Sequence, residues 1–440
     1  MYFQNADSSL VSDTKTGDDG KASAVMAAGG FVTVIESVMT QSGSGSGNGP
    51  TQLATFAGVK PGDNLHDDLG GMATEIASIT FDVSVPNEQV GNEYLLYSTC
   101  GGRISLGQGT GPVASARGLH SRVAVAEPVT NTVTLSGCNG TADLLVLSQD
   151  GDHVTTGWQY KSDVAVADGM AISLTADYQP PVDTTFDYTK VPDTISGLMV
   201  SRELHTAHGS LYLGDSVFTD LNGTEATATI AMPAPPGVSM LTTSTDQPTS
   251  GNGQQTFLAW GPATASYALP YGDVALEGYA TRPRLDAASH AITWTANPGV
   301  AADLVLGGYN SSRSDDQEVF HSWNWRIVAP YSAAQAALSF PVLPTTVFDF
   351  NPKDTDSPSV QRLTTAKVPG GYDAVRSVVF DTDIGVTITG ASGQTIYEDM
   401  YQRPDVVISA KVKPASKIKS KAAHPARRSS APKHFTLPAR

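Results

Sequence analysis

One short turn of the sequence is rich in oxygen-bearing side chains. In the stretch FDFNPKDTDS, eight consecutive residues contain Asp349, Asn351, Asp354 and Asp356. Oxygen ligands on a turn suit calcium, which stiffens joints in many extracellular β proteins. The same residues beside prolines also suit a bare turn, because short polar side chains hydrogen-bond to their own backbone. A bare turn is the favoured interpretation, and a structural calcium site is the alternative.

A second group of side chains is aromatic. Trp323 and Trp325 are two residues apart, and Tyr309 and Tyr331 lie near them in the sequence. Residues two apart on a strand face the same side of a sheet, so the two tryptophans share a face. If that face is the inner one, the rings belong to a core, and this is the favoured interpretation. If it is the outer one, the four aromatic residues form a strip on which sugar rings stack.

Two histidines lie three residues apart, His205 and His208. Zinc proteases place two histidines four apart on a helix with a glutamate between them, and this segment has neither feature. We therefore expect solvated loop histidines here.

The two cysteines, Cys100 and Cys138, each follow an expected strand (EYLLYST and VTLSG) and precede turn residues. Cysteines at equivalent ends of neighbouring strands predict a disulfide. It would stabilise the fold by about 4 kcal/mol in the chain-entropy model. Two separate buried thiols are the alternative.

Motifs typical of catalysis are missing from the sequence. It contains no C-x-x-C, no G-x-S-x-G and no recognisable pair of catalytic carboxylates. A hydrolase on a β fold would need acidic or histidine side chains that converge in a cleft. We therefore expect a protein that is not an enzyme and that needs no cofactor, the calcium alternative aside.

The elements that must position these residues are strands. Charged residues make up only 16% of the 440 residues, while glycine, proline and short Val/Ile/Thr/Leu runs are abundant. This composition predicts an all-β fold of tandem β-sandwich domains, immunoglobulin-like or fibronectin-like. Trp260 is interpreted as a core tryptophan of such a sandwich. The expected strands include Ala22–Val25, Glu93–Thr99, Ala142–Ser148 and one around Val375–Asp381. The expected units are a partial domain at 1–40, a Gly/Ser-rich joint at 41–50, sandwiches at 51–180 and 183–345, further strands at 346–410, and a disordered basic tail at 411–440.

The front of the chain resembles a known family. The runs T-x-x-D-G-K-A-S-A and G-G-F-V-T-V-I, within residues 1–40, resemble the second half of a bacterial immunoglobulin-like domain. The invasin type and the carboxypeptidase regulatory-like type both have this pattern. The resemblance implies a small secreted sandwich whose first strands, and any export signal, would lie upstream of Met1.

Charge separates the tail from the body. Residues 411–440 carry nine of the 27 basic residues and no acidic one, which leaves the rest of the chain at a net charge of −25. Such a body repels phosphate backbones, so we expect it to bind no nucleic acid. No stretch approaches the ~20 apolar residues of a membrane span.

The sequence therefore predicts a secreted or cell-surface structural or adhesive protein of a bacterium. Its partners would be envelope macromolecules or polysaccharides. An extracellular carbohydrate-binding protein is the alternative, followed by a β-fold hydrolase. Without the upstream inference, the N-terminus read literally predicts a cytoplasmic chain.

Overall fold

A computed structural model describes residues 1–401, apart from gaps at 19, 43–44, 66–77, 86–90, 101, 109–128, 137–139, 174–177, 214–216, 222, 249–252, 263–265, 277–280, 296–298, 316–318, 333, 346–347, 355, 357 and 378–393. All of these residues belong to one compact unit, Met1–Arg403. The described residues are almost entirely strands, and their two helices, α1 (Tyr271–Val274) and α2 (Tyr372–Val375), are single turns. The prediction of an all-β protein with sandwiched sheets is confirmed. The tail expected at 411–440 lies outside the described residues.

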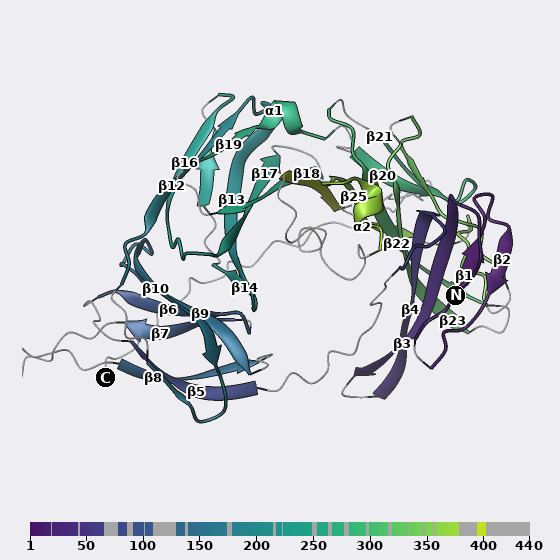
Figure 1. Ribbon diagram of the computed structural model, residues 1–440. Coiled ribbons are helices and arrows are strands. Elements are labelled where there is room, and N and C mark those ends of the chain that lie inside the picture. Colours follow the sequence, from purple (N-terminus) through teal and green to yellow (C-terminus); the bar gives the residue numbers. More distant parts are fainter. Residues whose placement is uncertain are drawn as a thin grey trace, which may run out of the picture. The chain divides into compact units, whose positions relative to one another are not determined.

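Thirteen of the described strands form one hydrogen-bonded sheet (Figure 1). Its order is β14 (Gly209–Tyr212), β13 (Ile195–Thr206), β17 (Ser239–Pro248), β18 (Gly253–Pro262), β26 (Gln394–Tyr401), β25 (Ser359–Lys367), β22 (Leu304–Ser314), β23 (Phe320–Pro330), β4 (Gly45–Val59), β3 (Gly30–Ser42), β1 (Tyr2–Gln4) and β2 (Leu10–Asp13), and β15 (Val217–Asp220) also pairs with β13.

Four smaller sheets complete the described strands. Their orders are β10 (Thr155–Ala165), β9 (Thr141–Gln149), β6 (Glu93–Ser98) and β7 (Arg103–Gln108); β11 (Ala171–Ser173), β5 (Ser78–Val85) and β8 (Val129–Ser136); β16 (Ala226–Met232), β12 (Val182–Thr189) and β19 (Ser266–Pro270); and β20 (Thr281–Asp286), β21 (Ala291–Thr295) and β24 (Ala337–Ser339).

The front strands are not a separate domain. Strand β4 pairs antiparallel with β3 and parallel with β23, so the first strands and the region around 320–330 share one sheet. Figure 1 shows β3 and β4, in purple, with the green strand β23 beside β4. The boundaries expected at 40 and 51 are therefore wrong, because they fall within the β3–β4 hairpin. The strand expected at Ala22–Val25 is also missing, and these residues follow a turn at Gly17–Lys21.

The sheet around β4 and β23 is buried on both faces. Leu53 and Trp325 lie in one core with Trp323 and Phe340, which we call the Trp325 core. Their neighbours along the strands point the other way, because successive strand residues alternate between faces. Ala54, Phe56 and Val328 lie in a second core with Tyr372 of α2, the Phe56 core. Burial on both faces is most complete at Leu53–Ala57 of β4, where five successive residues are buried.

Strand β6 shows the same alternation. Leu95 and Tyr97 lie in the Phe257 core, together with residues of β13, β17 and the sheet that contains β12. Tyr94 and Leu96 lie in the Leu144 core with residues of β5 and β8. The sheet that contains β6 is thus buried on both faces, between these two cores. Each of these buried side chains contributes about 1.5–3 kcal/mol to folding.

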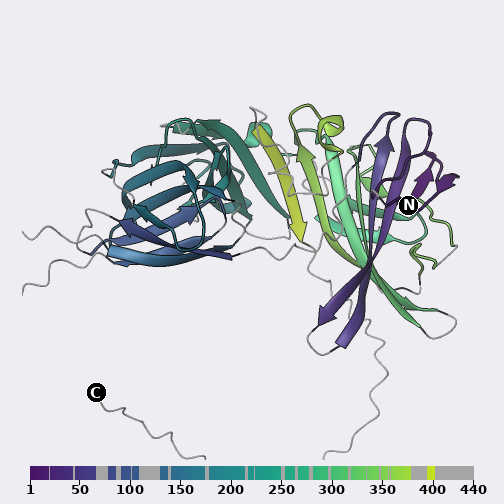
Figure 2. The same cartoon turned by 60° about the horizontal axis from the view of Figure 1, so that its bottom comes forward.

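The region expected as one sandwich at 183–345 is divided. Phe186 and Leu269 lie in the Phe257 core, whereas Ile292 and Trp294 lie in the Trp325 core. The halves are joined by β26, which pairs with β18 on one side and β25 on the other. Figure 2 shows this yellow strand between its two neighbours. Within the region 346–410, where further strands are expected, β25 and β26 belong to the large sheet.

Candidate functional site

The expected aromatic strip is part of the core. Trp323 and Trp325 are 0% exposed and Tyr309 is 1% exposed. Trp325 Nε1 donates a hydrogen bond to Thr55 Oγ1 at 2.9 Å, and Tyr331 packs against the same core. The two tryptophans do share a face, as expected, but it is the inner one. Their interpretation as a sugar-binding strip is therefore wrong, because no ligand ring reaches them.

The acidic turn is closed by an arginine. Arg313 donates from Nε and Nη2 to the two carboxylate oxygens of Asp356, at 2.8 and 2.9 Å, and the Asp356 side chain is fully buried. Arg313 also lies over the ring of Trp323, 5.4 Å from its centre.

The other oxygens of this turn are used as well. Asn351 exchanges two hydrogen bonds with the backbone of Leu343. Burial alone would raise the pKa of Asp349, but hydrogen bonds from Lys353 and Asn351 outweigh it and lower that pKa. Asp354 is exposed. No group of three or more acidic, histidine or cysteine residues in the described part of the chain has a metal-binding arrangement. Because Asp349 and Asp356 pair with basic side chains, the geometry favours the bare turn, and the calcium alternative stays a prediction.

Only one of the two cysteines lies in the described part of the chain. Cys100 follows β6 and packs against the Leu144 core, whereas Cys138 lies outside the described residues. The Cys100–Cys138 disulfide stays a prediction.

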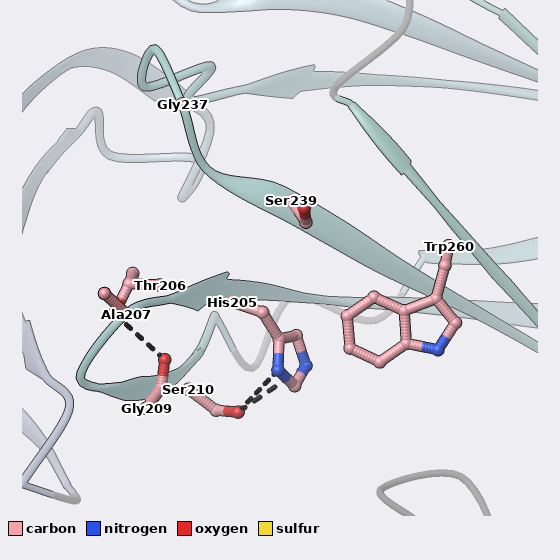
Figure 3. A pocket seen from close by; sticks show the side chains of 8 residues that line it. All are labelled: His205, Thr206, Ala207, Gly209, Ser210, Gly237, Ser239 and Trp260. Atoms are coloured by element: carbon pink, nitrogen blue, oxygen red, sulfur yellow. Dashed lines mark hydrogen bonds between the residues drawn. The ribbon is translucent and has the colours of Figure 1, made fainter. Parts of the chain in front are cut away.

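A pocket lies on the outward face of the large sheet, where β13, β14, β17 and β18 meet (Figure 3). Leu204 and Leu211 point into the Phe257 core, so their neighbours His205 and Ser210 point outward. Ser239 lies opposite His205 on the next strand. The hollow measures about 610 Å³, and its lining consists of His205, Thr206, Ala207, Gly209, Ser210, Gly237, Ser239 and Trp260.

Polar side chains form a short chain that begins behind the lining of this pocket, at Glu203, and reaches the pocket at His205 and Ser210. Glu203 Oε1 lies 3.4 Å from His205 Nε2, and both side chains are largely buried, at 21% and 14% exposure. The hydrogen bond with His205 is the main cause that lowers the pKa of Glu203, against the effect of its burial. Glu203 is therefore ionised over the physiological range and accepts hydrogen bonds only.

Ser210 approaches His205 without being in line with either ring nitrogen. Its Oγ lies 3.0 Å from Nδ1 and 3.5 Å from Nε2. An oxygen aligned with the in-plane lone pair of one ring nitrogen would lie much farther from the second ring nitrogen. These distances therefore place the Ser210 oxygen over the ring, where proton transfer to the imidazole is poorly aligned.

Trp260 forms the apolar wall of the pocket. Its ring meets the His205 ring edge to face, with the centres 4.2 Å apart. The indole N–H is buried and has no hydrogen-bond partner in the described part of the chain. The arrangement can stack a flat ligand on the exposed part of the aromatic wall and hydrogen-bond the ligand's polar groups along the adjoining polar wall.

Sequence reasoning missed this site for two reasons. It interpreted Trp260 as a core tryptophan of a sandwich, whereas the ring lies on the outward face of β18. It also interpreted His205 and His208 as solvated, although each has a carboxylate partner. The available signal was the alternation in RELHT, where Leu204 marks the inner face and therefore places Glu203 and His205 outside.

Comparisons with known proteins do not assign the chain. No protein-family model matches it, and no curated protein matches its sequence. Among the described residues, no helix is long and apolar enough to cross a membrane.

Proposed function

We propose that this chain is a structural and adhesive β-sheet protein of a bacterial cell surface or the extracellular space, and that it acts by binding rather than by catalysis. The observation that carries the proposal is the pocket. Trp260, His205 and Ser239 converge on the outward face of strands whose inner face is core. The buried face fixes these strands, so the binding groups are pre-positioned.

The large sheet supports the structural part of the proposal. Strand β26 joins β18 to β25 by backbone hydrogen bonds, so strands from the front of the chain and from residues 195–262 belong to one ladder. Such a scaffold suits a protein that holds partners at an envelope. The resemblance of residues 1–40 to secreted immunoglobulin-like domains points to the same compartment.

A carbohydrate ligand is the alternative that the pocket favours. Sugars present an apolar ring face and a rim of hydroxyl groups. An aromatic ring stacks on the first, and carboxylate, imidazole and hydroxyl groups hydrogen-bond the second. Trp260 supplies the ring, and His205, Ser210 and Ser239 supply polar groups, with Glu203 held against His205 behind them. The sugar-binding hypothesis therefore moves from the buried Trp323 and Trp325 to Trp260.

The hydrolase alternative has less support. Glu203, His205 and Ser210 are residue types found in nucleophilic sites. The Ser210 oxygen lies over the imidazole ring, however, so it is not aligned for the proton transfer that would activate it.

Export is tested by the two thiols. In protein purified from an oxidising compartment without reductant, we expect no free thiol and a mass that increases on reduction by the hydrogens of one disulfide. Two free thiols would remove the disulfide from this account and favour the cytoplasmic alternative.

Ligand binding is tested by co-sedimentation of the full chain with cellulose, chitin, peptidoglycan and alginate. We expect binding to at least one of them, and a loss of about tenfold in affinity for Trp260→Ala. Phe320→Ala is the matched control, because it removes an aromatic ring that is 68% exposed and outside the pocket. Equal losses in the two variants, or no binding to any of the four, would contradict the carbohydrate alternative.

A further inference from the structure

We propose that the β13–β14 hairpin is a pH-sensitive wall of the pocket, held in place by the His208–Asp163 ion pair at mildly acidic pH and loosened as the pH rises. This inference concerns the regulation of the proposed binding site and rests on that function.

The tip of this hairpin is itself pocket wall. Thr206, Ala207 and Gly209 line the hollow, while His205 and Ser210 stand at the base of the hairpin (Figure 3). The Thr206 hydroxyl donates to the Gly209 carbonyl oxygen at 3.1 Å and accepts from the His208 backbone N–H at 3.1 Å. These two bonds make the tip a rigid unit, so whatever holds His208 also positions the wall.

The tip is held by the sheet that contains β9 and β10. His208 Nε2 lies 2.7 Å from Asp163 Oδ1 at the end of β10. The Asp163 backbone N–H donates to Asp143 Oδ1 of β9 at 2.7 Å. Gly209 has a φ of +133°, and a Cβ there would lie 3.4 Å from the carbonyl oxygen of Thr99, so glycine permits this close approach.

The charges around His208 in the described part of the chain all favour its protonated form. Asp163 lies in contact with it and Asp143 lies beyond, and both carboxylates act to raise the pKa of His208. Tyr160 of β10 stays neutral, because burial and Asp143 raise its pKa. The hydrogen bond with Asp163 is the main cause that raises the pKa of His208, and the same bond lowers the pKa of Asp163.

The direction of the pH effect follows from these shifts. A histidine with a raised folded pKa stabilises the closed hairpin fully below its ordinary value of 6.5, and this contribution is lost as the pH rises through the raised value. Asp163 contributes above its ordinary value of 3.8, and its contribution is lost as the pH falls through its lowered value. The ion pair is therefore strongest between pH 3.8 and pH 6.5, the ordinary pKa values of the two groups. Once His208 has lost its proton at higher pH, the neutral imidazole keeps only a hydrogen bond to Asp163.

The size of the effect is bounded by exposure. The Asp163 side chain is 72% exposed, so solvent screens the pair. An exposed ion pair of this kind changes a local equilibrium by no more than about fivefold. A change of this size is enough to alter ligand affinity in a graded way. It leaves the rest of the fold intact.

The experiment is hydrogen–deuterium exchange of the full chain without ligand, at about pH 5.5 and about pH 8, with rates corrected for the intrinsic effect of pH. We expect amides 204–211 to be about threefold to fivefold more protected at the lower pH in the wild type. His208→Arg keeps a permanent charge and should stay protected at both pH values. His208→Gln should be unprotected at both.

The matched control is His153→Gln, because His153 is an exposed histidine 3.8 Å from Glu93 and outside the hairpin. It should behave as the wild type. A wild type without pH dependence in this segment, or a His208→Gln variant that keeps it, would overturn the inference. Because the exchange experiment uses no ligand, its result does not decide whether the pocket binds a polysaccharide. Failure of the co-sedimentation test, in turn, would not change the exchange result.

Discussion

Two polar clusters, one around Arg313 and one around His205, differ in what their charged side chains contact. Around Arg313, the carboxylate of Asp356 is fully buried and has a basic partner on both of its oxygens. Around His205, Glu203 has His205 and Ser210 as partners, and the hydroxyls of Ser210 and Ser239 border a pocket. The first cluster is closed and stabilises a turn. The second is open, and its free hydrogen-bonding capacity faces solvent and ligand.

The largest expected difference is between a tryptophan of the core, Trp325, and a tryptophan of the pocket, Trp260. Trp325→Ala should lower the free energy of unfolding by about 3–5 kcal/mol, because the ring is 0% exposed and its indole donates to Thr55. Trp260→Ala should cost about 1–2 kcal/mol, because its ring borders the pocket. Chemical denaturation of both variants provides the measurement. Equal losses would mean that Trp260 is a core residue after all.

The closed cluster can be disrupted by replacing its basic residue, Arg313. Arg313→Met should destabilise the protein by about 3–5 kcal/mol, because it leaves the Asp356 carboxylate buried and unpaired. The double variant R313M/D356N removes that charge and should recover part of the loss. If the single and double variants unfold at the same denaturant concentration, the ion pair is not what closes the turn.

A third buried carboxylate has no basic partner among the described residues in contact with it. Asp246 accepts hydrogen bonds from the Tyr271 hydroxyl and from the Gln255 backbone N–H. Burial is the main cause that raises its pKa from 3.8 to about 6, and the two hydrogen bonds oppose it. The protonated form of Asp246 therefore persists in the fold up to about pH 6.

The stability that Asp246 contributes should be present below pH 3.8 and lost as the pH rises through about 6. Asp246→Asn should lack this loss. The unfolding free energy of the variant minus that of the wild type should therefore increase by up to about 3 kcal/mol between low pH and pH above 6. The measurement is the difference in unfolding free energy between the two proteins across this range. A constant difference would contradict the raised pKa.

Local sequence patterns predicted individual strands well. The strands expected at Glu93–Thr99 and Ala142–Ser148 appear as β6 and β9, because continuous apolar runs between turn residues leave few other structures. The strand expected around Val375–Asp381 fails in its described part, because Val375 ends the helical turn α2, whose Tyr372 fills the Phe56 core.

Long-range pairing was beyond local patterns. Nothing within 41–59 indicates that Thr51 lies beside Trp323, because a parallel pair between segments so far apart in sequence leaves no local signal. The pocket was missed for the same reason. Trp260 and His205 are brought together by the register of β13, β17 and β18. The closure of the acidic turn depended equally on Arg313, which is remote from it in sequence.

The most direct measurement compares Trp260→Ala and Arg313→Met in both stability and polysaccharide co-sedimentation, at a temperature where both variants are folded. The account predicts that Trp260→Ala loses binding with little loss of stability. It predicts that Arg313→Met loses stability and binds as the wild type does. If binding and stability fall together in both variants, the distinction between an open binding cluster and a closed structural one is wrong.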